Sequence, residues 1–353
     1  MSWLLIFVPI AIGLDFLAPG QHLLIFVISS LAILPLAGWM GRATEQLAEQ
    51  LGEGVGGLLN ATFGNAAELI IALAALRAGL HDVVKASIAG SIVGNILLVL
   101  GAAMLAGGFR RSEQHFNAAG ARSQATMLML AAIALIVPAA FQAGGSTTAE
   151  GLTRLSVSIS VVLFLVYLLY LVFVLVTHSA LFVGPYQAEK SDTHVSVARA
   201  VFVLASATAG IAWISEILVG TIEPTAHEFG LSNVFVGVFV VAILGNAAEH
   251  ATAISAALKD RMDLSLSIAI GSSVQVALFV APVLVFASFI IGPATMDLAF
   301  SAGLVLMVLL SVLITAQVAG DGRSDWLKGL QLLAVYLVFG LTFFFLPGAQ
   351  SHP

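Results

Sequence analysis

The sequence contains no cysteine and very little charge. Among its 353 residues there is no Cys, and Asp, Glu, Lys and Arg together make up 9%. The absence of cysteine excludes disulfides and thiolate metal sites. Soluble domains usually carry about 25% charged residues, so a water-soluble globule of this size could not cover its surface. With 60% hydrophobic residues, the chain is predicted to be an all-α polytopic protein embedded in a lipid bilayer.

Two further features are missing. No basic run interleaved with aromatic residues is present, so nucleic acid is not expected as a partner. The first segment, Met1 to Leu17, has no basic region and no Ala-x-Ala site, both of which a cleaved signal peptide needs. We therefore expect it to be a retained membrane span.

Apolar runs long enough to cross a bilayer occur eleven times. A membrane helix needs about 20 mostly apolar residues. By that measure the predicted spans cover roughly 3–18, 22–41, 54–78, 83–107, 124–142, 153–177, 197–220, 231–258, 264–291, 296–318 and 327–347.

The basic residues predict the orientation. With eleven spans and a cytoplasmic N-terminus, ten of the 13 Lys and Arg residues fall on the cytoplasmic side, and only Arg77, Lys85 and Arg154 fall on the other. Positive charge concentrates in cytoplasmic loops. The N-terminus is therefore predicted inside and the C-terminus outside, in the cell (inner) membrane.

One polar pentapeptide occurs twice inside these apolar runs. Gly-Asn-Ala-Ala-Glu stands at 64–68 and again at 245–249, which is 245 − 64 = 181 positions later. A charged side chain at mid-bilayer costs roughly 2.5 to 3.5 kcal/mol, so two such glutamates suggest a functional site. Asn65 and Glu68 are three residues apart and would share one face of a helix, as would Asn246 and Glu249.

The same offset extends beyond the pentapeptide and indicates an internal repeat. It also maps Gly90-Ser91 onto Gly271-Ser272. Spans two to six and seven to eleven then form two units of five, and an odd number of spans inverts the second unit in the membrane. The predicted organisation is an N-terminal helix (1–19), a first five-helix repeat (20–177), a cytoplasmic linker (178–196) and a second five-helix repeat (197–353).

The residues around the two glutamates suit a hard cation. Calcium takes six to eight oxygen ligands, more than two carboxylates supply. The predicted binding set is Glu68, Glu249, Asn65, Asn246, Ser91, Ser272 and Gln275, with backbone carbonyls freed at Gly64 and Gly245. Without a cation, burial and mutual repulsion would disfavour two charged carboxylates, so protons would compete for the same oxygens. A site of this kind, open to one side at a time, is the minimum machinery of an antiporter.

Three more titratable residues are candidates for gating or proton relay. His250 follows Glu249 directly and could hydrogen-bond Glu216. Glu216 and Glu45 stand near opposite ends of their spans and could guard the vestibules. A packed histidine and ordinary interfacial charges are the alternatives for these residues.

The repeated motif resembles the two signature repeats of the calcium/proton exchanger family, within the cation/calcium exchanger superfamily. The resemblance includes Gly-Asn-Ala-Ala-Glu-Leu-Ile at 64–70 and Gly-Asn-Ala-Ala-Glu-His-Ala at 245–251. It implies eleven helices, a calcium site on the two motif glutamates and proton-coupled efflux. Ala67 and Ala248 replace the proline found in related sodium/calcium exchangers. The acidic helix often found between spans six and seven is reduced to Glu189 and Asp192.

Several alternatives stay open at this stage. Sodium coupling, or transport of manganese or potassium, would keep the fold and change the ion. A metal-dependent intramembrane enzyme would want His or Asp ligands beside a general base, and a channel would want a continuous polar lining. We expect no enzyme activity and no cofactor, with Ca²⁺ and H⁺ as transported partners; the sequence leaves a homo-oligomer open.

Overall fold

The long apolar segments fold as helices because backbone polar groups in lipid must be bonded within the segment. The computed structural model describes residues 2–345 apart from 52, 110, 146–147 and 179–195. Most of the predicted linker 178–196, including Glu189 and Asp192, therefore lies outside the described residues.

The order of elements is almost entirely helical. The first half contains η1 (Ser2–Ile6), α1 (Phe7–Leu17), α2 (His22–Leu51), α3 (Glu53–Phe63), α4 (Ala66–Arg77), α5 (His81–Val93), the π-helical turn η2 (Gly94–Val99), α6 (Leu100–Gly108), β1 (Gln114–His115), α7 (Ala118–Ala143), α8 (Ala149–Val172) and the π-helical turn η3 (Phe173–Thr177). The second half contains α9 (Val197–Glu228), α10 (Asn233–Val236), the π-helical turn η5 (Gly237–Val241), α11 (Ala242–Leu258), α12 (Met262–Gln275), the π-helical turn η6 (Val276–Val280), α13 (Ala281–Ala287), α14 (Ala302–Asp321), β2 (Arg323–Ser324) and α15 (Trp326–Phe345).

These elements supply the eleven predicted spans. In the described chain, nine continuous helical segments are long and apolar enough to cross a membrane, and a shorter apolar helix covers Trp3–Leu17. The consecutive helices α3 and α4 occupy the remaining predicted span. The prediction of an all-α polytopic membrane protein is thus confirmed.

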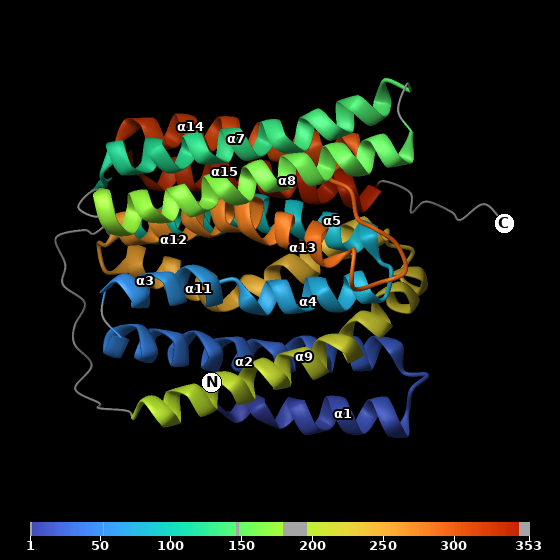
Figure 1. Cartoon of the computed structure of the whole chain (residues 1–353). Coiled ribbons are helices and arrows are strands. Elements are labelled where there is room, and N and C mark those ends of the chain that lie inside the picture. Colours follow the sequence, from blue (N-terminus) through green and yellow to red (C-terminus); the bar gives the residue numbers. More distant parts are fainter. Residues whose placement is uncertain (1, 52, 110, 146–147, 179–195, 346–353) are drawn as a thin grey trace.

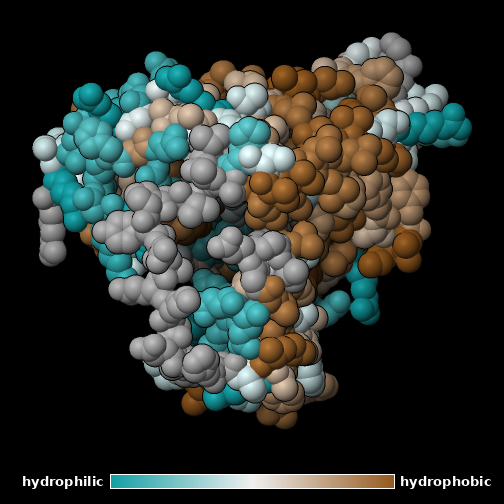
Figure 2. Space-filling model, turned by 60° about the vertical axis from the view of Figure 1, so that its left-hand side comes forward, coloured by the Kyte–Doolittle hydropathy of each residue, from teal (hydrophilic) through white to brown (hydrophobic). Residues whose placement is uncertain are grey.

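The helices form layers that run in one direction (Figure 1). Helices α1, α2 and α9 lie together along one edge, where α2 packs along α9. Helices α7, α8, α14 and α15 lie along the opposite edge, and α4, α5, α11 and α12 lie between. Both copies of the pentapeptide are therefore in the middle layer, and Figure 2 shows hydrophobic residues gathered on one side of the surface beside a hydrophilic face.

Two details differ from the sequence prediction. The predicted span 296–318 begins too early, because α14 begins at Ala302. The preceding loop buries Met296, Leu298 and Phe300, and its backbone N–H groups at Met296 and Leu298 donate to Ser288 Oγ (2.9 Å) and Ser156 Oγ (3.0 Å). Apolar composition there reflects packing of a loop and not a helix in lipid.

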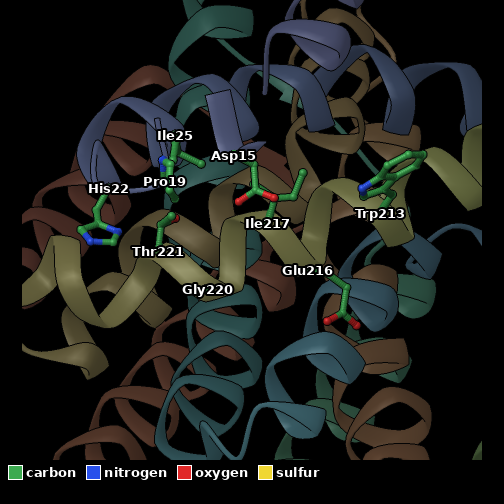
Figure 3. Close-up of a pocket in the computed structure, with 9 residues that line it drawn as sticks. All are labelled: Asp15, Pro19, His22, Ile25, Trp213, Glu216, Ile217, Gly220 and Thr221. Carbon is green, nitrogen blue, oxygen red and sulfur yellow. The ribbon is translucent and has the colours of Figure 1, made fainter. Parts of the chain in front are cut away.

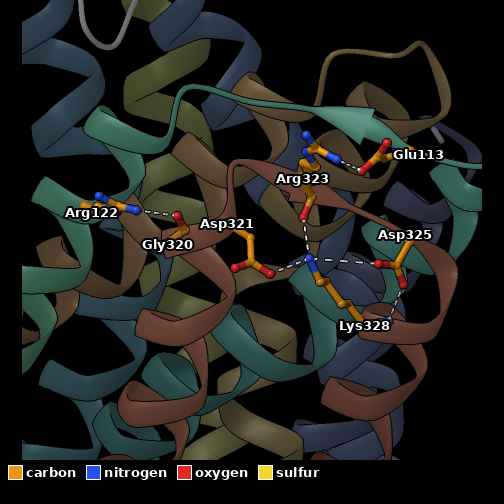
Figure 4. Close-up of polar contacts among 7 residues, drawn as sticks. All are labelled: Glu113, Arg122, Gly320, Asp321, Arg323, Asp325 and Lys328. Atoms are coloured by element: carbon orange, nitrogen blue, oxygen red, sulfur yellow. Dashed lines mark hydrogen bonds and ion pairs between the residues drawn. The ribbon is translucent and has the colours of Figure 1, made fainter.

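The second detail is a small antiparallel ladder that no strand pattern predicted. β1 pairs with β2, with Gln114 opposite Ser324 and His115 opposite Arg323. The ladder joins the α6–α7 connection of the first repeat to the α14–α15 connection of the second. Around it, Lys328 Nζ donates to Asp321 Oδ2 (2.7 Å) and Arg323 pairs with Glu113 (3.3 Å) (Figure 4). The ladder and the Arg323–Glu113 pair join the two repeats at one end of the bundle.

Candidate cation site

The two pentapeptides cross at the centre of the bundle, each glycine against the other copy's glutamate. A Cβ added at Gly245 would lie 3.3 Å from both Cα and Cβ of Glu68. A Cβ added at Gly64 would lie 3.2 Å from Glu249 Oε1. The absence of a side chain at both glycines therefore lets the two glutamates approach the crossing point, as the repeat predicts.

The two copies differ in backbone conformation. In the first copy the chain breaks between α3 and α4, and Asn65 (φ −100°, ψ 17°) precedes the first turn of α4, which contains Glu68. In the second copy Asn246 and Glu249 both lie within α11. Asn246 and Glu249 therefore lie on one helix, as expected, whereas Asn65 directly precedes the helix that contains Glu68; the span predicted over 54–78 consists of α3 and α4 with a break at Gly64-Asn65.

The break places Glu68 in a favourable position for a negative charge. The first N–H groups of a helix have no partner within the helix, and its N-terminus carries a partial positive charge. Glu68 stands in the first turn of α4, so these groups partly compensate the cost of burying its carboxylate. Glu249, by contrast, lies within α11 and not in a first turn.

Each motif asparagine contacts the serine of the opposite repeat. Ser272 Oγ on α12 donates to Asn65 Oδ1 (2.8 Å), and Asn246 Nδ2 donates to Ser91 Oγ on α5 (3.0 Å). The 181-residue offset maps one pair onto the other. The structure thus brings together both asparagines and both serines of the predicted set, in two related pairs.

Two further side chains join the first pair, and one of them was not predicted. Asn65 Nδ2 donates to Gln275 Oε1 (2.6 Å), as expected for a site residue. Asn95 Nδ2 donates to Ser272 Oγ (3.2 Å), and Asn95 is 1% exposed. The signal that could have found Asn95 is its position as a lone amide in an apolar run.

Several buried oxygens at the crossing have no hydrogen-bond partner within the described chain. They are Oε1 and Oε2 of Glu68, Oε2 of Glu249 and Oδ1 of Asn246. Glu68 is 4% exposed. A buried carboxylate is costly unless another group neutralises or hydrogen-bonds it, so these oxygens can accept a cation or protons.

No conventional metal cluster accompanies them. Among the described residues, no group of three or more His, Cys, Asp or Glu side chains could hold a metal ion. A cation at the crossing would depend on two carboxylates together with amide, hydroxyl, carbonyl or water oxygens. Such all-oxygen sets suit hard cations.

The crossing is accessible from one side. A cavity of about 250 Å³ lies beside Glu249, and its lining includes Asn60, Ser267 and Gly271. A Cβ at Gly271 would meet only Gln124 Nε2, at 3.5 Å. At the repeat-related position the packing is closed, because a Cβ at Gly90 would overlap the backbone of Val238.

Comparison with known proteins identifies the family. The model of the sodium/calcium exchanger protein family matches residues 21–176 and 199–345. A Ca(2+)/H(+) antiporter of Synechocystis sp. is 45% identical over 365 residues, covering 98% of this chain and 96% of the relative. The chain belongs to this exchanger family. Ca(2+)/H(+) antiporter ChaA of Bacillus subtilis is 43% identical, covering 91% and 92% of the two chains.

Solved structures agree with this assignment. The exchanger matches native YfkE with a TM-score of 0.83 at 39% identity, covering 97% of this chain and 100% of that one. The H⁺/Ca²⁺ exchanger CAX, at 17% identity and a TM-score of 0.67, shares the fold.

The three candidate gating residues lie in different places. Glu45 is exposed near the end of α2. Glu216 on α9 forms an exposed ion pair with Arg77 (3.4 Å). Glu216 also lines a cavity of about 300 Å³ with Asp15 and His22, where its carboxylate is turned away from Asp15 (Figure 3).

His250 does not make the contact that its sequence position suggested. Its Nε2 lies 3.1 Å from Asn95 Oδ1, whereas the partner of Glu216 is Arg77. His250 therefore joins the hydrogen bonds around Asn95 and Ser272 at the crossing, and does not contact Glu216 beside the cavity at α9.

Proposed function

We propose that this exchanger moves Ca²⁺ and protons in opposite directions, and that Glu68 and Glu249 hold either cargo in turn. Two carboxylates can balance one divalent ion or bind protons instead. The observation that carries the proposal is the convergence of buried oxygens without partners from both repeat copies. The Ca(2+)/H(+) antiporter relatives support the choice of cargo.

Access in this proposal alternates between the two ends of the bundle. The cavity beside Glu249 lies at the ends of α7, α8 and α12 nearest the predicted cytoplasm. Close packing of Gly90 against Val238 blocks the related route on the other side. We place the N-terminus in the cytoplasm, as the distribution of basic residues indicates, and we propose the cell membrane as the location.

The test is calcium transport by purified protein in vesicles, driven by a proton gradient. Glu68→Gln and Glu249→Gln should each lower the rate at least about 100-fold, because a neutral amide cannot balance the cation or exchange a proton. Glu150→Gln is the matched control, since the Glu150 side chain is 75% exposed and its ion pair within the described residues is with nearby Arg154. It should transport at the wild-type rate.

Two outcomes would contradict the proposal. Transport at the wild-type rate in either central glutamine variant would remove the glutamate site. Transport driven by a sodium gradient at constant pH, with none driven by protons, would replace the proposed coupling ion with sodium.

A further inference from the structure

We infer that the cation site is asymmetric: Asn246 supplies a ligand oxygen and Asn65 does not, and Asn95, held by His250, imposes this difference. Asn95 is then a positioning residue that acts through Ser272 and Asn65. The inference rests on the proposed function, because it takes the crossing of the two motifs to be the cation site. It is carried by the directions of the hydrogen bonds around the two asparagines.

The hydrogen bonds on the Asn65 side form a chain that runs in one direction. His250 Nε2 contacts Asn95 Oδ1 (3.1 Å), Asn95 Nδ2 donates to Ser272 Oγ (3.2 Å), Ser272 Oγ donates to Asn65 Oδ1 (2.8 Å) and Asn65 Nδ2 donates to Gln275 Oε1 (2.6 Å). An amide oxygen only accepts, so His250 Nε2 must carry the proton of the first bond. Every donor therefore points from His250 towards Gln275.

The direction of this chain follows from the proton count of Ser272. A serine hydroxyl has one proton to donate and two lone pairs to accept with. Because Asn95 donates to it, Ser272 accepts from that side and gives its own proton to Asn65. Asn65 consequently presents its oxygen to Ser272 and its nitrogen to Gln275, so both of its amide groups already have side-chain partners.

The Asn246 side has the opposite arrangement. Asn246 Nδ2 donates both to Ser91 Oγ (3.0 Å) and to the carbonyl of Ala242 (2.9 Å). Its Oδ1 is buried and has no partner in the described part of the chain. The amide oxygen of Asn246 is thus available beside Glu68 and Glu249.

The repeat shows why the two sides differ. The 181-residue offset maps Asn95 onto Val276 and His250 onto Leu69. Neither Val276 nor Leu69 can donate to Ser91, so Ser91 is free to accept from Asn246. The corresponding π-helical turns η2 and η6 contain Asn95 and Val276, so one amide replaced by an alkyl side chain changes which way the opposite asparagine points.

The test measures the calcium KM and maximal rate of variants in proton-driven vesicles. Asn95→Val copies Val276 into the first repeat and frees Asn65 to turn its oxygen towards the cation. The KM should fall about fivefold as an extra oxygen ligand tightens binding, and the maximal rate should fall because release slows. A variant that was merely damaged would not bind calcium more tightly.

Two further variants isolate the route of the effect. In an Asn65→Ala background, adding Asn95→Val should no longer lower the KM, since coupled residues give non-additive effects. Asn246→Ala should raise the KM about tenfold more than Asn65→Ala does. Ser87→Ala is the matched control, because Ser87 is a buried polar residue on neighbouring α5 that bonds only to Val84 (2.9 Å) in the described contacts.

His250→Leu, which copies Leu69, provides a second approach should Asn95→Val fold poorly. This change removes the hydrogen bond from His250 to Asn95 Oδ1, so Asn95 is no longer held towards Ser272. The calcium KM should fall, as in Asn95→Val, and only when Asn65 is present. A KM that rises or stays constant in both variants, or that falls equally without Asn65, overturns the inference. If that occurs while Glu68→Gln and Glu249→Gln still abolish transport, the proposed function stands; if those variants transport normally, both fall.

Discussion

The contact between Gly245 and Glu68 allows a test in which protein stability and transport should respond differently. A methyl group at Gly245 would lie 3.3 Å from Glu68 Cα and Cβ and 3.6 Å from its Cγ. Carbon atoms pack best at about 3.5 to 4.0 Å. In Gly245→Ala, Glu68 must therefore withdraw by a few tenths of an ångström from the crossing point.

The expected size of the effect follows from that displacement. A misplacement of about 1 Å at a working site can cost about 100-fold, so a third of it should cost about fivefold in calcium transport. Alanine in a helix is more favourable than glycine by roughly 0.5 to 1 kcal/mol. The thermal stability of the purified variant should consequently stay the same or rise while transport falls.

The assay compares proton-driven calcium uptake with the unfolding temperature of each variant. Gly245→Val adds more bulk and should lose more activity than Gly245→Ala. Gly38→Ala is the matched control, since nothing lies within 4 Å of a Cβ at Gly38 in α2. Wild-type uptake by both Gly245 variants would show that Glu68 does not need this close approach.

Two other expectations concern topology and stability. Because the chain has no cysteine, a single cysteine introduced as Gln21→Cys or Lys259→Cys can be labelled with an impermeant maleimide in intact cells. The Gln21→Cys variant should react directly, and the Lys259→Cys variant only after the cells are permeabilised. The reverse pattern would show that the predicted orientation is inverted. Lys85 Nζ donates to Asp297 Oδ1 (2.7 Å) with side chains 14% and 27% exposed, so Asp297→Asn should lower the free energy of unfolding by roughly 1.5 to 3 kcal/mol. Denaturant unfolding in detergent measures this free energy. The double variant Lys85→Met/Asp297→Leu should recover part of the lost stability. An unchanged free energy of unfolding in Asp297→Asn would show that the ion pair does not stabilise the protein.

The sequence was informative wherever periodicity and repetition carried the information. Apolar length predicted the spans, and the 181-residue offset predicted that residues of the two repeats would meet. The structure brings Asn65 to Ser272 and Asn246 to Ser91, two contacts related by the same offset, because a duplicated fold places related residues at one crossing. These are consequences of chain length, hydropathy and symmetry, which one sequence contains.

The orientation of individual side chains and the pairing of short strands could not be predicted from apolar length and the repeat. The orientation of the Asn65 amide depends on Asn95 and His250, two residues that lie on different helices and break the repeat symmetry. The β1–β2 ladder is two residues long on each side and depends on loops far apart in the sequence. In each case the decisive neighbour is brought into place only by the tertiary fold.

The two identical pentapeptides show why the helix break was missed, and what the break means for transport. Gly-Asn-Ala-Ala-Glu is broken after α3 in one copy and helical within α11 in the other, so the pentapeptide itself permits both backbones. The choice must come from the packing around it, which is open at Gly271 and closed at Gly90. If the packing opened at Gly90 and closed at Gly271, the surroundings of the two copies would be exchanged. The packing would then no longer favour a break in the first copy and a continuous helix in the second. In the proposed exchanger, the difference between the copies is therefore the property expected of one of two alternating states, with the glutamates at the crossing point in both.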